Sequence, residues 1–269
     1  MLHDVLDLLM CPHCGDDLLL QDGTVRCPAG HSHDIAKQGY VNLLRGAAPF
    51  TGDTTAMVEA RVAFLGAGHF DPITRALVAA ADPGPGCVVD LGAGTGHHLA
   101  AVLDAFPGRE GVALDVSKHA LRRAAKAHPL VGAVVADVWQ PLPVRSGVAG
   151  LVINVFAPRN AAELRRVLHP EGALVVVAPT GDHLGELVSA LDLLTVEADK
   201  QEGIDDRLGE HFTVAARETV EFQMSLSHKD VEALVGMGPS AFHGRGAAAG
   251  LTEPVAVTGS VAVTRYAPR

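Results

Sequence analysis

The stretch that decides the fold is CVVDLGAGTGHH, residues 87–98. A mainly apolar run containing one acid, Asp90, is followed by glycines at every second position and then by two histidines. This order is typical of a buried strand, a tight glycine loop and the first turn of a helix. Amides in such a loop approach a ligand closely, and the following helix presents its positive end. The stretch therefore predicts a pocket for a nucleoside-containing cofactor.

Short apolar runs alternate with helical patterns beyond this stretch. Strands are expected at 87–91, 111–115, 132–136, 151–156 and 173–178, and helices at 97–105, 118–127, 160–168 and 183–194. This alternation indicates an α/β fold with a parallel sheet and helices on both faces. Nearer the C-terminus, strand-like patterns at 211–225 and 257–266 flank a helix near 228–236. They predict an antiparallel pair at the sheet edge.

Two further acids end the next two expected strands. Asp115 follows Gly111-Val-Ala-Leu, where a ribose diol lies in a doubly wound sheet, and Asp137 follows Val134-Val-Ala, where it suits an adenine amino group. Each acid alone is equally well explained as a loop carboxylate or a helix cap. Together with Asp90 they favour a cofactor site. A nicotinamide dehydrogenase is the rival interpretation, but the loop lacks the G-x-G-x-x-G spacing and follows some 85 residues.

A second signature lies near the N-terminus, where Cys11, Cys14, Cys27 and His31 have the spacing C-x2-C-x12-C-x3-H. Zinc prefers four tetrahedral thiolate and imidazole ligands, and two close pairs supply them without a large framework. Four protein ligands leave no open position, so the predicted zinc is structural. His33 is the fallback for His31. The alternative is three buried cysteines and a surface histidine.

The composition of the chain limits the classes of protein to which it can belong. The chain has 269 residues, of which 48% are hydrophobic, which is enough for a sizeable core. It has no apolar run of roughly 18 residues and no basic start, so neither a membrane helix nor a signal peptide is expected, and we expect a cytoplasmic protein. A net charge of −10 argues against indiscriminate nucleic-acid binding, so any RNA contact must use local basic patches.

Residues 90–96, DLGAGTG, resemble the first motif of class I S-adenosylmethionine-dependent methyltransferases, which have a seven-stranded Rossmann-like domain. Four other segments resemble the bacterial 23S rRNA guanine-N1 methyltransferase family. These segments are CPHC at 11–14, HDIAKQGYVNLL at 33–44, GD at 52–53 and ARVAFL at 60–65. The resemblance covers nearly the whole chain. It implies methylation of a guanine in hairpin 35 of 23S rRNA at a 745- or 748-type site, with tylosin-type resistance among the family's roles, and a homodimer.

The resemblance also implies site residues. Zinc would be held by the four residues named above, and cofactor contacts would include His183 and Phe70, which stands where the family has a tyrosine and lacks its hydroxyl. The expected cofactor contacts are Phe70, Asp90, Gly92, Gly94, Gly96, His97, His98, Asp115, Asp137 and His183. The expected division is a zinc-binding RNA-recognition module at 1–46, a linker and helices at 47–84, and a methyltransferase domain at 85–269.

Catalytic residues are less sharply indicated. Asn154 could hold the edge of the target base at a strand end, and Phe156 could stack on a flipped guanine. Ordinary strand-end packing explains both equally well. Asp137, Asp90 and the ribosomal RNA itself are open candidates for the proton acceptor. Two other functions stay open at this point, a small-molecule methyltransferase and a non-catalytic zinc-containing RNA-binding protein.

Overall fold

The computed structural model describes residues 2–46, 52–191, 200–238 and 250–269. Residues 47–51, at the start of the linker and helices expected at 47–84, and the end of the helix expected at 183–194 lie outside the described residues. Within these ranges, no helix combines the length and the apolar character that crossing a membrane requires.

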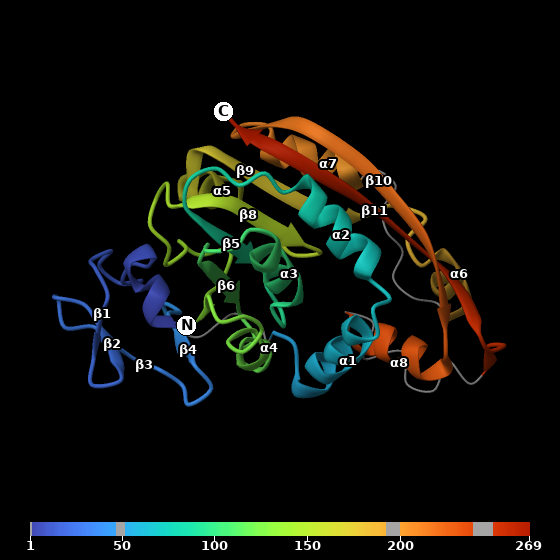
Figure 1. The fold of residues 1–269 in the computed structure, drawn as a ribbon, viewed down its shortest axis with the longest axis horizontal. Helices are drawn as coiled ribbons and strands as arrows, with labels where there is room; N and C mark the ends of the chain where they lie inside the picture. The colour runs from blue at the N-terminus through green and yellow to red at the C-terminus, as the bar shows by residue number, and fades with distance from the viewer. Residues whose placement is uncertain (1, 47–51, 192–199, 239–249) are drawn as a thin grey trace.

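The core is an eight-stranded sheet in the order β10-β11-β9-β8-β5-β6-β7-β4. Its strands are β4 (Tyr40–Asn42), β5 (Cys87–Leu91), β6 (Gly111–Asp115), β7 (Val131–Val135), β8 (Ala149–Val155), β9 (Leu168–Pro179), β10 (Phe212–Leu226) and β11 (Val255–Pro268). Strands β4 to β9 pair in parallel, and β11 pairs antiparallel with both β9 and β10. The expected parallel sheet with an antiparallel pair at its edge is confirmed (Figure 1).

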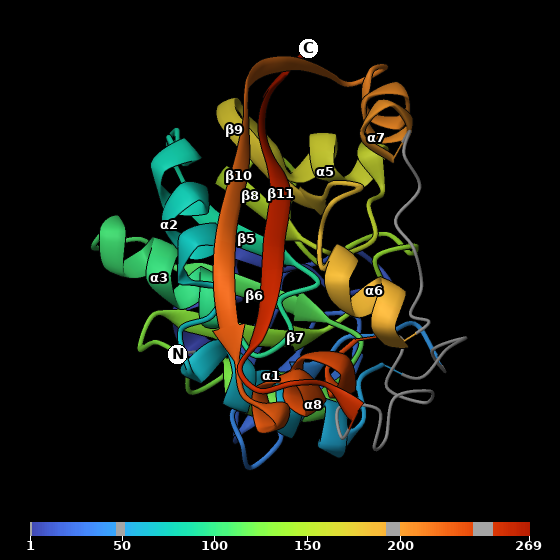
Figure 2. The same ribbon diagram turned by 90° about the vertical axis from the view of Figure 1, so that its right-hand side faces the viewer.

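Helices cover both faces of this sheet (Figure 2). They are α1 (Thr55–Gly66), α2 (Asp71–Ala80), α3 (His97–Ala105), α4 (Lys118–Ala124), α5 (Ala161–Val167), α6 (Gly185–Leu191), α7 (Lys200–Leu208) and α8 (His228–Gly236). Side chains alternate across a strand, so Val88 of β5 packs into the core under α1 to α4, whereas Val89 packs into the core under α5 and α7. Burial on both faces explains why the parallel strands read as continuous apolar runs.

Helix α7 was not anticipated, because its sequence KQEGIDDRL is mostly polar. Only Ile204 and Leu208 are buried, and they pack into the core that also contains α5. An apolar pair four residues apart is too short a pattern to indicate a helix by itself.

The N-terminal segment forms a small module with one strand in the main sheet. The 3-10 helix η1 (Leu2–Leu8) precedes a three-stranded antiparallel sheet of β1 (Leu19–Gln21), β2 (Thr24–Arg26) and β3 (Ser32–Asp34). Strand β4 then pairs in parallel with β7 and extends the sheet, so the seven strands expected for the methyltransferase domain gain an eighth. Figure 1 shows the blue module at one end of the molecule.

Contacts outside β4 also hold the module against the core. The Arg145 guanidinium donates to the Asp7 carbonyl at 2.8 Å and pairs with Asp17, while the Met10 amide donates to the Pro143 carbonyl at 3.1 Å. The metal module and the cofactor fold are therefore packed together as one body.

Candidate active site and metal centre

Two glycine turns bring the expected metal ligands together. The Gly15 amide donates to the Cys11 carbonyl at 2.9 Å, and the Gly30 amide donates to the Cys27 carbonyl at 3.0 Å. Both glycines have φ near +80 to +88°, which an L side chain rarely adopts. Each turn therefore brings together the side chains of one pair of ligands, which are three residues apart in Cys11/Cys14 and four apart in Cys27/His31.

The four donor atoms fit one tetrahedral ion. They lie within 4.8 Å of one another. Cys14 Sγ lies 3.6 Å from Cys27 Sγ, and His31 Nδ1 lies 3.3 Å from Cys27 Sγ and 3.5 Å from Cys11 Sγ. Ligands of a tetrahedral zinc ion are separated by about 3.6 to 3.8 Å, so the spacing and the donor set suit zinc. His33 lies outside the cluster and stacks on His13 at 5.8 Å, so the fallback ligand is not needed.

The glycine loop connects β5 to α3 and passes close to a neighbouring strand end. Gly92, Gly94 and Gly96 all have positive φ. A Cβ on Gly92 would lie 2.4 Å from the Ala157 Cβ, so the loop can take this course only with glycine there. The loop thus leaves open space in front of the ends of β5 and β6.

Asp115, at the end of β6, fixes this loop. Its Oδ2 accepts from the Gly94 amide at 2.8 Å, and its Oδ1 accepts from the Ser117 amide at 2.7 Å at the start of α4. Burial raises the pKa of Asp115, while the two hydrogen bonds favour the charged form. Each carboxylate oxygen keeps a second lone pair for a ligand hydroxyl.

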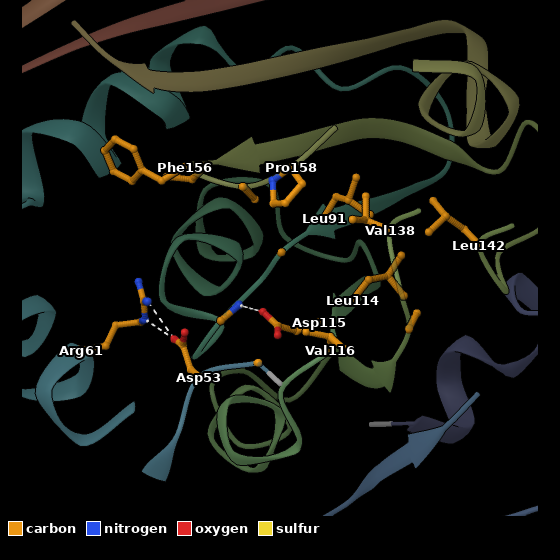
Figure 3. Close-up of a pocket in the computed structure, with 16 residues that line it drawn as sticks. Asp53, Arg61, Leu91, Leu114, Asp115, Val116, Val138, Leu142, Phe156 and Pro158 are labelled. Atoms are coloured by element: carbon orange, nitrogen blue, oxygen red, sulfur yellow. Dashed lines mark hydrogen bonds and ion pairs between the residues drawn. The ribbon is translucent and has the colours of Figure 1, made fainter. Parts of the chain in front are cut away.

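A cavity of about 210 Å³ lies in front of these residues (Figure 3). Asp115 and the glycine loop form its floor, and apolar side chains form one end. These apolar residues are Leu114, Val116, Val138 and Leu142. Figure 3 shows Arg61, Asp53 and Phe156 at the opposite end. The cavity therefore offers an apolar slot, a carboxylate and a polar end in a row.

Helix α5 supports the apolar end. Glu163 accepts from the Leu142 amide at 2.6 Å, and Arg166 donates to the Leu142 and Val144 carbonyls at 2.9 and 2.7 Å. Asn160, which caps α5, also donates to the Val138 carbonyl at 3.2 Å. The Arg166 guanidinium is thus engaged in hydrogen bonds within the protein.

A smaller cavity of about 60 Å³ lies behind the loop and is lined by Asp90, His97 and His98. Burial and the charge of Asp115 raise the pKa of Asp90 to about 8, so this carboxyl is largely protonated at neutral pH. Burial, followed by the nearby His97 and Arg61, lowers the pKa of His98 to about 3, and its ring is neutral. His98 Nδ1 lies 3.0 Å from Thr74 Oγ1, which anchors α3 on α2.

A larger cavity of about 670 Å³ adjoins the other end of the first cavity. Its wall carries three rings, Phe70, Phe156 and His183, whose centroids are 5.7 to 6.2 Å apart. Asp53, Arg61, Phe156 and Ala157 line both cavities. Phe156 and Arg61 line all three cavities, so the three cavities adjoin one another beside these two side chains.

The two candidate catalytic residues have different surroundings. Phe156 is 39% exposed and has φ of 52°, an outlier for a bulky residue of the kind that collects at functional sites. Asn154 is fully buried, and its amide donates to the Leu91 and Pro158 carbonyls at 3.1 and 3.0 Å. Asn154 therefore holds the ends of β5 and β8 together and lines none of the three cavities.

Asp137 and His183 also lie apart from the first cavity. The Asp137 carboxylate accepts from the Trp139 amide at 2.9 Å, and its neighbours Ala136 and Val138 line the cavity in its place. His183 lines only the larger cavity. The expected contacts of both residues with a cofactor stay predictions.

Sequence reasoning missed the pair formed by Arg61 and Asp53. Arg61 donates two hydrogen bonds to Asp53 Oδ2, at 2.8 and 3.2 Å, and a third to the Met237 carbonyl at 2.8 Å. No motif or spacing marks this pair, because Asp53 precedes α1 and Met237 follows α8. Asp53 and Arg61 do lie in two of the segments that resemble the methyltransferase family, 52–53 and 60–65. That resemblance is the signal from which the pair could have been predicted.

Two family models match separate parts of the chain. Residues 9–45 match the model of the RlmA N-terminal zinc ribbon, and residues 88–172 match a methyltransferase domain. The second match contradicts the dehydrogenase alternative. A solved structure of a Bacillus halodurans protein described as a methyltransferase aligns with a TM-score of 0.50 at 15% identity. It covers 72% of this chain and 97% of that one, and supports the fold alone.

Two curated relatives align over nearly their whole length. One, from Micromonospora griseorubida, carries the name of a 23S rRNA (guanine-N(1)-)-methyltransferase and is 51% identical over 98% of this chain and 99% of its own. The other is the 23S rRNA (guanine(748)-N(1))-methyltransferase of Streptomyces fradiae, 49% identical over 90% of this chain and 89% of its own.

Proposed function

The chain belongs to the family of 23S rRNA (guanine-N1)-methyltransferases, and we propose that it methylates N1 of a guanine in hairpin 35 of 23S rRNA, using S-adenosylmethionine. The observation that carries this proposal is the junction of two cavities. One has the apolar slot, carboxylate and glycine loop that suit a nucleoside cofactor, and the other has aromatic walls that suit a base.

The first cavity accommodates the parts of the cofactor in order. The apolar end would take adenine between Val116, Val138 and Leu142, and the Asp115 carboxylate would accept hydrogen bonds from the ribose hydroxyls. The amides of the glycine loop and the small cavity beside Asp90 would receive the methionine end, with His97, His98 and Phe70 close by. Asp137 is proposed to reach the adenine amino group.

When bound, the cofactor supplies a methyl group already activated on a sulfonium. The chain's own task is to align guanine N1 with that carbon and to receive the N1 proton. Asp53 is the carboxylate that lines both cavities among the described residues, and Arg61 holds its Oδ2. We assign Asp53 Oδ1 as the acceptor of the N1 proton. Asp137, one of the two acids considered from the sequence, lines none of the three cavities described above.

The N-terminal zinc module, residues 1–46, is proposed to recognise the shape of the RNA, and residues 85–269 to perform methyl transfer. The module's exposed cations are Arg26, Lys37 and Arg45. They are outnumbered by acids in the same segment, so shape is a better basis for recognition than charge. Exposed cations of α4, among them Arg122 and Arg123, would add phosphate contacts.

The test is transfer of a labelled methyl group to 23S rRNA that lacks the modification, followed by primer extension across hairpin 35. We expect a stop at one guanine of the hairpin loop. Label in small molecules but not in RNA would favour a small-molecule methyltransferase, and cofactor binding without any transfer would favour a non-catalytic RNA-binding protein.

Three finer expectations belong to the same proposal. Tylosin resistance is tested by the inhibitory concentration of the drug for a strain that lacks the methylation and expresses this chain. A homodimer is tested by light scattering on the purified protein. A ribosomal substrate also implies a cytoplasmic location, tested by fractionation of the native cells.

A further inference from the structure

An arginine in the wall of the larger cavity has no partner among the described residues. Arg159 lines that cavity, and its Nε atom is buried without a hydrogen-bond acceptor. Burial is the main cause that lowers the pKa of Arg159, and the positive charge of Arg207 acts in the same direction. Because a guanidinium stays protonated in proteins, Arg159 is a partly buried positive charge that no described carboxylate neutralises.

A positive charge in this position is costly, since part of its water shell is lost and no described carboxylate takes the place of the water. Two other arginines of intermediate exposure avoid this cost. Arg61 pairs with Asp53 at 2.8 Å, and Arg166 pairs with Glu163 at 2.7 Å. The position of Arg159 at a cavity, without such a pair, therefore indicates that a ligand supplies the negative charge.

The backbone on both sides of Arg159 is held in place. The side-chain amide of Asn154 donates to the Pro158 carbonyl at 3.0 Å, and the next residue, Asn160, caps α5. The guanidinium therefore extends from a fixed turn after β8. Phe156 lies three residues earlier in the same turn, and both side chains line the larger cavity.

The charges around the larger cavity favour an anion. Arg61, Arg159 and Lys200 line it. Its one carboxylate among the described residues, Asp53, is already paired with Arg61. Since the whole chain has a net charge of −10, it has no general attraction for RNA and must hold phosphates through particular cations. A guanidinium suits this task, because it donates two parallel hydrogen bonds to phosphate oxygens, and the pair is stronger where water is excluded.

We propose that Arg159 binds a backbone phosphate beside the target guanosine and so anchors the nucleotide whose base enters the larger cavity. This inference rests on the proposed function. A phosphate contact fixes the position of a nucleotide without reading its base. The cofactor carboxylate is the other source of a negative charge, but Arg159 lines neither the cavity in front of the glycine loop nor the small cavity beside Asp90.

The experiment removes the charge of one phosphate at a time. Synthetic hairpin 35 carries an uncharged methylphosphonate on the 5′ or the 3′ side of the target guanosine, with the same deoxynucleotides in the unmodified control hairpin. The wild type should bind one of the two modified hairpins about tenfold or more weakly than the control, as measured by filter retention. Equal affinity of the wild type for all three hairpins would overturn the proposal.

Variants of Arg159 connect that phosphate to the guanidinium. Arg159→Met should bind the control hairpin about tenfold or more weakly than the wild type does, with a salt dependence reduced by about one phosphate contact, and should lose no further affinity on the sensitive methylphosphonate. Arg159→Lys, which keeps the charge without the two parallel donors, should fall between them. Arg75→Met removes an exposed arginine of α2 that lines none of the three cavities and should bind like the wild type. Additive losses from Arg159→Met and the methylphosphonate would overturn the assignment.

Two further measurements separate this role from the other roles open to an arginine. The dissociation constant for S-adenosylhomocysteine, measured by calorimetry, should be the same for the wild type and Arg159→Met. An equal loss of cofactor and RNA affinity would assign Arg159 to the cofactor carboxylate and overturn the proposal.

The urea midpoint of Arg159→Met should equal or exceed that of the wild type, because an unpaired charge is removed. A lower midpoint would assign Arg159 to the fold and overturn the proposal. Failure of the proposed function is distinct, since it is the absence of methyl transfer to the control hairpin by the wild type, whereas the binding measurements require no transfer.

Discussion

The Asp115 carboxylate accepts a hydrogen bond from the Gly94 amide at 2.8 Å, which links the end of β6 to the glycine loop after β5. Its other oxygen accepts from Ser117 at 2.7 Å, at the start of α4. One side chain thus sets the positions of the loop and of a helix while it lines the cavity. This arrangement makes Asp115 the most direct test of the cofactor site.

Replacing Asp115 with asparagine should weaken cofactor binding by about tenfold or more, because a charged acceptor for the ribose hydroxyls becomes a neutral amide that cannot accept at both atoms. Calorimetric titration with S-adenosylhomocysteine measures this. Asp104→Asn is the matched control, since Asp104 lies on α3 with its side chain 75% exposed. Equal affinities in wild type and Asp115→Asn would exclude Asp115 from the site.

Replacing Cys14 with serine should release zinc and abolish RNA methylation while cofactor affinity stays within about twofold, because the metal organises the module and not the cofactor cavity. Metal content by mass spectrometry, methyl transfer and calorimetry are the readouts. Cys87→Ala, which changes a buried cysteine of β5 outside the cluster, should retain the metal. Parallel loss of zinc and of cofactor binding would contradict the division of labour.

Replacing Gly92 with alanine should abolish cofactor binding and destabilise the fold by more than the cost of a left-handed residue, because the new Cβ would collide with the Ala157 Cβ at 2.4 Å. Gly108→Ala isolates the backbone cost, since Gly108 has φ of +86° and no atom within 4 Å of such a Cβ. The control should lose about 1 to 2 kcal/mol in urea unfolding. Equal losses of stability and of cofactor affinity in Gly92→Ala and Gly108→Ala would contradict a collision at Gly92.

Asp90 should make the free protein less stable as pH rises. Its folded pKa of about 8 lies above the unfolded value of 3.8, so the folded state binds more protons between these values and stability falls with increasing pH. From pH 5 to pH 8 the loss from this group is at most about 4 kcal/mol. Asp90→Asn should flatten the profile, as measured by urea unfolding at each pH. The same slope in both proteins would show that another group is responsible.

Arg166 should contribute to stability and to the adenine slot, and not to RNA affinity. Arg166→Met removes donors to the Leu142 and Val144 carbonyls and a pairing partner of Glu163, at a cost of about 2 to 4 kcal/mol. Arg165→Met is the neighbouring control, because within the described part of the chain Arg165 donates only to the Arg269 carbonyl, at 3.3 Å. Urea unfolding and RNA binding by filter retention measure the two properties. Weaker RNA binding by Arg166→Met with unchanged stability would show that Arg166 contacts RNA and has no structural role.

The parts of the structure that depend on local spacing could be predicted from the residue pattern alone. The strand, glycine loop and helix of residues 87–105 form where the pattern predicts them, because the glycines allow the positive φ angles of the tight turn between a buried strand and a helix start. The close pairs Cys11/Cys14 and Cys27/His31 form one cluster, because each pair lies on its own glycine turn.

The way in which distant segments complete the site follows from the folded arrangement and not from local residue patterns. Arg61 of α1 reaches the Met237 carbonyl through the packing of α1 against α8, and His183, in the turn after β9, accepts from the Ser260 amide of β11, 77 residues further along the chain. Strand β4 joins the main sheet through β7, although its sequence reads as part of the metal module. These contacts depend on which elements lie side by side in the assembled sheet, and no local pattern of residue types encodes that arrangement.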